Sequence, residues 1–143
     1  MENIKARAKR LMDCFNLSIE GWEKIDAYQG SLCYVCRTKP VSGKRLATDH
    51  CHTTGLVRGL LCNHCNHLLG KIENALKRHP AKPERPEDQV QWISVILERI
   101  IQFLIYPPAT KALGEETYGY AGRVGTKQHR KDVRRAAKLR DKS

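Results

Sequence analysis

Two Cys-x-x-Cys pairs are the residues of this sequence whose types and spacing suggest the clearest chemistry. The first pair is Cys33 and Cys36, and the second is Cys62 and Cys65, with 25 residues between the pairs. Two thiolates from one such turn can bind the same ion, so the pairs predict a structural zinc site with four sulfur ligands. The gap exceeds the usual spacing of about 15–20 residues, which predicts an inserted hairpin. The alternatives are four buried free cysteines or a redox motif, but no βαβ pattern accompanies the pairs.

The segment between the pairs carries groups that can move protons and bind a hard metal ion. His50 is the candidate general base, because a neutral imidazole accepts a proton from water near neutral pH. Asp49 offers carboxylate oxygens suited to magnesium or manganese, and Asn66, next to the last cysteine of the second pair, can add an amide oxygen. His52 is a candidate ligand of the scissile phosphate. Arg58 is expected either to clamp a phosphate or to form a structural salt bridge.

The remaining cysteines and histidines have several possible roles. Cys51 stands between two histidines and could compete for zinc, although the two pairs are the favoured ligands. Cys14 is expected to be a small core residue. His64 is expected to be exposed or to support a ligand, and His67 to lie on a helix surface.

The charge of the chain predicts a polyanionic partner. The formal net charge is +11 over 143 residues, and the sequence pI is about 9.6. Residues 121–143 hold nine Lys or Arg against Asp132 and Asp141. This segment is interpreted as a DNA-binding arm, the alternative being a solubilising tail. The candidate DNA contacts are Arg58 and, within the arm, Arg123, Lys127, Arg130, Lys131, Arg134, Arg135 and Lys138.

The compartment is expected to be intracellular and reducing. No apolar run follows the first residues, so no signal peptide is visible. The longest apolar stretch, residues 90–106, is interrupted by Glu98 and Arg99, so no membrane span is expected. In a reducing compartment, paired cysteines indicate metal ligands rather than disulfides.

Hydrophobic periodicity predicts the elements that would position these groups. A helix is expected over residues 4–15, with Lys5, Arg7, Lys9 and Arg10 on its outer faces, and a second helix follows Ser18 as its cap. Strands are expected near 44–48 and 56–61, with a turn at 53–55, and a helix from 63 through 76. A proline-rich linker, 78–87, precedes an apolar helix over 89–105. A loop over 114–126 and a basic helix from 127 complete the chain.

Four segments are predicted from this pattern. Residues 1–30 form a helical segment, 31–77 a zinc-bound core, 78–113 a linker with the apolar helix, and 114–143 the basic arm. The helix over 89–105 is so apolar in so small a chain that it is expected either to cap the core or to pair with a second copy in a homodimer.

The motifs together resemble the recombination endonuclease VII family, within the HNH or ββα-metal nucleases. The resemblance covers residues 18–76 and rests on both cysteine pairs, on Asp49-His50-Cys51-His52, on the run from Gly55 to Asn66, and on Leu69-Gly70. It implies a zinc-pinned ββα unit that cleaves DNA with one magnesium ion held by Asp49 and Asn66, with His50 activating water. The founding member, a phage resolvase, cuts branched DNA as a dimer.

Two positions depart from the family pattern. Cys51 stands where the founding member has an acidic residue, and Leu69 stands where it has a glutamate one turn after the asparagine.

Taken with its motifs, the sequence predicts an α+β protein with a zinc-stabilised ββα-metal core and flanking helices. The predicted function is a metal-dependent DNA endonuclease, with branched or nicked DNA as the candidate substrate, and the resemblance implies a phage or mobile-element origin. The alternative is a non-catalytic zinc protein that binds nucleic acid or another protein.

Overall fold

The computed structural model describes residues 3–41, 43–118 and 127–140. The chain divides into two compact units, residues 1–97 and 98–143. The described residues form six helices and one two-stranded sheet, which confirms the α+β class. The candidate site lies wholly in the first unit.

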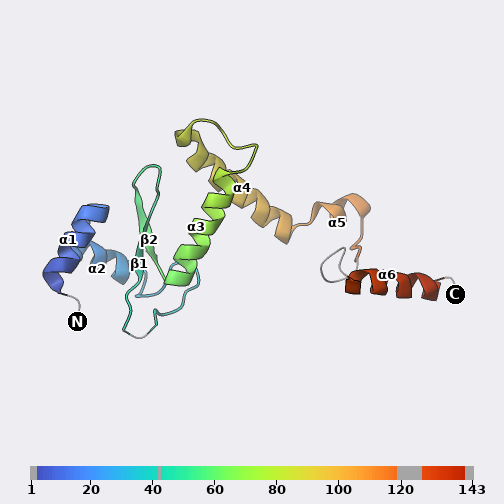
Figure 1. Cartoon of the computed structure of the whole chain (residues 1–143), viewed down its shortest axis with the longest axis horizontal. Coiled ribbons are helices and arrows are strands. Elements are labelled where there is room, and N and C mark those ends of the chain that lie inside the picture. The colour runs from blue at the N-terminus through green and yellow to red at the C-terminus, as the bar shows by residue number, and fades with distance from the viewer. Residues whose placement is uncertain (1–2, 42, 119–126, 141–143) are drawn as a thin grey trace. The chain divides into compact units, whose positions relative to one another are not determined.

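Two short helices begin the first unit (Figure 1). Helix α1 spans Ile4–Phe15 and α2 spans Ile19–Tyr28, as the periodicity predicts. Ser18 caps α2, because its hydroxyl accepts a hydrogen bond of 3.0 Å from the backbone N–H of Gly21. The turn between the helices uses Asn16 in the left-handed conformation, which asparagine tolerates better than most residues.

A β-hairpin lies between these helices and a longer third helix (Figure 1). Strand β1, Ala47–His50, pairs antiparallel with β2, Val57–Leu61. Helix α2 packs against β2, and α3, Asn63–Lys77, contacts both strands. The predicted turn is present in the hairpin loop, where Gly55 has a φ of 78° and the Cys51 N–H donates to the Leu56 carbonyl at 2.8 Å.

The first strand begins later than the sequence predicts. The prediction was 44–48, whereas β1 covers 47–50, so Asp49 and His50 lie within the strand. The reason is a turn: the Lys44 N–H donates to the Val41 carbonyl at 2.9 Å, which keeps the chain from extending before Leu46.

The hydrophobic core of the first unit is small. Its fully buried members are Leu60 and Cys33, each with 0% exposure. The cluster around them also includes Leu11, Trp22, Leu46 and Leu61. Small domains bury a low fraction of their surface and often need a metal to be stable. The core therefore fits a fold that a structural ion completes.

Two side chains on α1 differ from expectation. Arg7 was expected on an outer face, but it is buried and its guanidinium lies 4.7 Å from the centre of the Trp22 ring. The aromatic face and the long aliphatic stem make this position favourable for an arginine. Cys14 was expected in the core, but it is exposed, because the apolar stripe that contains Leu11 and Phe15 turns past it.

Helix α4, Pro86–Ile105, begins three residues before the predicted start. Proline is well accommodated in the first turn of a helix, and Glu87 and Asp88 there suit the positive end of the helix dipole. Residues 86–97 of α4 belong to the first unit and the rest to the second. No helix in the described part of the chain combines the length and apolar character that a membrane span requires.

The second unit contains the end of α4, the short helix α5 at Pro108–Leu113, and α6 at Lys127–Arg140. Helix α6 agrees with the predicted basic helix and carries the candidate DNA contacts except Arg58 and Arg123, the latter of which lies outside the described residues. The end of α4 exposes a row of large apolar side chains, namely Ile100, Ile101, Phe103, Leu104 and Ile105. The homodimer through residues 89–105 stays a prediction.

Candidate functional site

The four paired cysteines come together at one point of the first unit. The sulfurs of Cys33, Cys36, Cys62 and Cys65 all lie within 4.8 Å of one another, and those of Cys36 and Cys62 are 3.9 Å apart. Four sulfurs bound tetrahedrally to zinc at about 2.3 Å would be separated by about 3.8 Å. The cluster therefore fits one zinc ion, and Cys51 is not part of it.

Each cysteine pair is held by its own local structure. In the first, the Cys33 N–H donates to the Thr38 carbonyl at 3.0 Å and the Arg37 N–H donates to the Cys33 carbonyl at 2.9 Å. In the second, Cys62 caps α3, because its sulfur accepts from the Cys65 N–H at 3.4 Å. The second pair thus forms the start of α3, and the helix fixes the orientation of these two cysteines.

The crowded sulfurs differ in acidity. The Thr38 hydroxyl, 2.9 Å from the sulfur of Cys36, lowers the pKa of that thiol to about 6. Hydrogen bonding with the Cys62 thiol, together with burial, raises the pKa of Cys65 to about 12. Sulfurs this close repel one another as thiolates unless a cation lies between them. A bound zinc ion would supply that charge and deprotonate its ligands.

A charge network forms between the hairpin and α3. The Arg58 guanidinium donates to both carboxylate oxygens of Asp49, from Nε to Oδ2 at 2.7 Å and from Nη2 to Oδ1 at 3.1 Å. Its Nη1 donates to Oε1 of Glu73 at 2.6 Å. The hydrogen bonds with Asp49 and then with Glu73 raise the pKa of Arg58. Asp49 is buried, with 8% exposure, so its charge needs this partner.

An irregularity in the hairpin explains how Arg58 reaches Asp49. Asp49 pairs with Gly59 and the next residue, His50, pairs with Val57, so Arg58 is an extra residue on β2. Such a bulge bends the strand and re-aims its side chains. Arg58 consequently reaches the Asp49 carboxylate, although the two residues are not opposite each other in the ladder.

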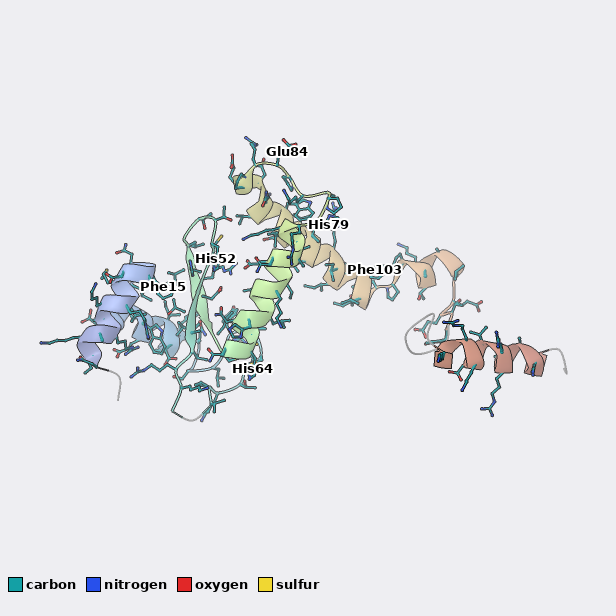
Figure 2. All side chains as sticks on the ribbon, viewed as in Figure 1. Phe15, His52, His64, His79, Glu84 and Phe103 are labelled. Atoms are coloured by element: carbon teal, nitrogen blue, oxygen red, sulfur yellow. The ribbon has the colours of Figure 1, made fainter. Side chains whose placement is uncertain are left out.

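The histidines contact a different set of residues. The rings of His50 and His52 stack with their centres 4.7 Å apart, and Phe15 from α1 meets His50 edge-on at 5.3 Å. Figure 2 shows Phe15 on α1 and His52 on the hairpin, on neighbouring elements of the first unit. His50 is half-buried and His52 is exposed. Asp49 contacts Arg58, whereas His50 contacts His52 and Phe15.

Asn66 lies in the first turn of α3. Its backbone N–H donates to the Cys62 carbonyl at 2.9 Å, so its place follows directly from the second cysteine pair. His64, in the same turn, and His67, directly after Asn66, are both exposed. Cys51 is buried in the hairpin loop, where hydrogen bonding with the Thr54 side chain lowers its pKa.

Gln29 is a positioning residue that sequence reasoning missed. Its side-chain amide donates to the carbonyls of Leu32 and Leu60, at 3.0 and 2.9 Å, and its Oε1 accepts from the Leu60 N–H at 2.8 Å. Gln29 thereby pairs with one edge of β2, the strand that leads into Cys62. A Cβ at Gly59 would lie 3.0 Å from that same Oε1, so a glycine suits the close approach. One buried glutamine after a helix gives no recognisable signal in the sequence.

Glu73 was also missed, and here a signal existed. The resemblance seen in the sequence implies a glutamate three residues after the asparagine, where this chain has Leu69. Glu73 lies seven residues after Asn66, two helical turns along the same face of α3. A search for acidic residues on that face would have found it.

Comparisons with known proteins show which sequences this chain is similar to. The family model for recombination endonuclease VII matches residues 8–104. The chain is 33% identical over 107 residues to the "Gene 59 protein" of Mycobacterium phage D29, and 31% identical over 107 residues to that of Mycobacterium phage L5. Each match covers 74% of this chain and 54% of the phage protein, so the chain spans about half the length of these relatives. No solved structure matches significantly.

Proposed function

Because the chain belongs to the recombination endonuclease VII family, we propose that it is a metal-dependent DNA endonuclease that hydrolyses phosphodiester bonds. The observation that carries the proposal is the four-sulfur cluster within the matched segment. It ties the loop that holds Cys33 and Cys36 to the junction of β2 and α3, next to Asn66. Strand β2 is paired with the strand that carries Asp49 and His50.

In this proposal zinc is structural. The sulfur cluster includes residues from both ends of the hairpin segment, and all four protein ligands are used. A zinc site with four protein ligands is closed and leaves no position for substrate. The chemistry must therefore come from neighbouring residues.

His50 is the proposed general base. It takes a proton from the attacking water, and its contact with Phe15 orients the ring. His52, stacked on His50 and exposed to solvent, is placed to hold the scissile phosphate. Both roles need histidines that reach solvent from a rigid element, and the hairpin is such an element.

Asp49 and Asn66 are the proposed ligands of a magnesium or manganese ion. Their carboxylate and amide oxygens fit a hard cation. Each Asp49 oxygen already accepts a bond from Arg58, but a carboxylate has about four acceptor positions, so a further ligand bond remains available. When bound, the ion would neutralise charge that develops on the phosphate. Arg58 and Glu73 then serve to position the Asp49 carboxylate.

Basic residues are proposed to supply affinity for DNA. Lys127, Arg130, Lys131, Arg134, Arg135 and Lys138 of α6, with Arg123 before it, would contact backbone phosphates without reading sequence. Arg58 is the least suited of the predicted contacts, because its guanidinium is bound by two carboxylates. A homodimer through residues 89–105 would use the exposed apolar side chains at the end of α4.

The test offers linear duplex, nicked plasmid and a four-way junction side by side, with magnesium and with manganese. We expect cleavage of at least one substrate, and a rate lower by about 10²–10⁴ in His50→Ala. His67→Ala is the matched control, because His67 is an exposed histidine near the start of α3. Equal rates for the two variants would contradict the role of His50. No cleavage of any substrate by the parent chain would contradict the proposed function.

A further inference from the structure

A second region of the first unit has the chemistry of an anion site. An open cavity of about 920 Å³ lies between α1 and the segment that leads into β1. Four of its lining residues are basic, Arg7, Arg10, Lys44 and Arg45, and none of the described residues that line it is acidic. Asn63, the first residue of α3, also lines the cavity, so the positive end of that helix dipole is nearby.

Arg7 is the residue that distinguishes this cavity from an ordinary basic surface. Its exposure is 9%, and its Nη2 is buried with no hydrogen-bond partner in the described structure. Native proteins rarely leave a buried charged donor unsatisfied, so each such group needs an explanation. The Trp22 ring, 4.7 Å from the guanidinium, fixes the orientation of Arg7 but cannot accept that hydrogen bond in the way an oxygen does.

The position of the cavity indicates which anion would complete it. Phe15 lines the cavity and also contacts the ring of His50, so the two regions share a wall. Ala47 and Thr48, the residues directly before Asp49, lie on the same wall. A polyanion bound at His50 would therefore pass this cavity.

We infer that the cavity binds a backbone phosphate of the DNA outside the cleavage site, with Arg7 as its central ligand. This inference rests on the proposed function. The phosphate oxygen accepts the Arg7 hydrogen bond that the protein alone leaves unmade. Lys44 and the start of α3 add favourable charge.

The first experiment measures duplex binding by anisotropy over a salt series, without added magnesium so that the DNA stays intact. The variant is Arg7→Met, whose unbranched side chain preserves packing against Trp22. The control is Lys5→Met, which removes one charge from an exposed position on the same helix. For Arg7→Met we expect the slope of log affinity against log salt to flatten by about 0.9, the value for one duplex phosphate, and by less for the control. Equal slopes for the two variants would overturn the inference.

Thermal melting separates binding from a structural role. Removing a buried donor that lacks a partner should leave the melting temperature of the free protein unchanged or raised. A large fall in the melting temperature of Arg7→Met, without a change in DNA binding per folded molecule, would mean that Arg7 only supports the fold.

A third measurement does not depend on altering Arg7. In a Trp92→Phe background Trp22 is the only tryptophan. Saturating duplex should change its emission, because the ligand binds the guanidinium that lies over the ring. Inorganic phosphate alone should produce a smaller change of the same sign. No change with duplex would overturn the inference, while cleavage by the parent chain would still stand.

Discussion

Replacing Gln29 with leucine tests whether one buried amide holds the hairpin in place. Leucine has a similar size, so Gln29→Leu removes hydrogen bonds without opening a large cavity. The Leu60 N–H and the Leu32 carbonyl lose the Gln29 side chain, whereas the Leu60 carbonyl still accepts from the Tyr34 N–H at 3.3 Å. One buried N–H and one partly buried carbonyl are therefore left without that partner.

The expected loss follows from the cost of such groups. Each unsatisfied buried donor or acceptor costs about 1–3 kcal/mol. The buried Leu60 N–H at about 2 kcal/mol and the partly buried Leu32 carbonyl at about 1 kcal/mol should together lower the free energy of unfolding by about 3 kcal/mol. That is a large share of the roughly 5–15 kcal/mol that stabilises a domain. With a denaturant slope of about 1.5 kcal/mol per molar, the urea midpoint should fall by about 2 M.

The assay is urea unfolding in zinc-containing buffer, followed by tryptophan fluorescence. Both tryptophans, Trp22 and Trp92, lie in the unit that contains the hairpin. Gln91→Leu is the control, since Gln91 is an exposed glutamine on α4 and should shift stability by no more than about 0.5 kcal/mol. A loss below about 1 kcal/mol in Gln29→Leu would refute the reasoning, because Gln29 would then contribute no more than an average surface residue.

Three further outcomes are expected. Cys62→Ser should lose zinc by elemental analysis and unfold the first unit, because metal binding here contributes to folding; zinc retained at one ion per chain would contradict the four-sulfur site. Arg58→Met should lower the free energy of unfolding by about 2–3 kcal/mol, since Asp49 would stay buried without its partner, whereas Lys9→Met, which breaks an exposed pair with Asp13, should cost about 0.3–0.5 kcal/mol in the same urea titration. Similar losses of unfolding free energy in Arg58→Met and Lys9→Met would show that the buried pair contributes no more than an exposed one. Deleting residues 123–143 should flatten the salt dependence of DNA binding by about 0.9 for each phosphate contact removed; an unchanged slope would exclude the arm as a DNA contact.

The proposed chemistry and the stability of the hairpin are linked through β2. Gln29 holds β2 at Leu60, Arg58 projects from the bulge on the same strand, and Cys62 follows directly after its end. A change at any of these positions is therefore expected to alter both unfolding and cleavage. Only variants such as His50→Ala, in which a ring with solvent access is removed, should separate the two.

Local patterns determined which elements form and where most of them lie. Four features were predictable from the sequence because each depends on residues close together in the chain. They are the apolar stripe over 4–15, Ser18 as a cap, the turn at Gly55 and the basic helix from Lys127. The four-cysteine cluster was readable as well. Each Cys-x-x-Cys turn supplies two sulfur ligands, and this can be recognised from the spacing alone. A tetrahedral ion needs four ligands, so the two turns are expected to share one ion.

Tertiary structure decided which side chains meet. The bulge that brings Arg58 to Asp49, the insertion of Gln29 against β2, and the burial of Arg7 over Trp22 each join residues from separate elements. The start of β1 was misplaced for the same reason, because a turn and the pairing with β2 outweigh the local preference of residues 44–46. The sequence alone thus determined the family pattern, the charge and the four cysteines that cluster. The fold decided the partners of the charged and amide groups, because burial and hydrogen bonding depend on what packs opposite each residue, which spacing along the chain does not specify.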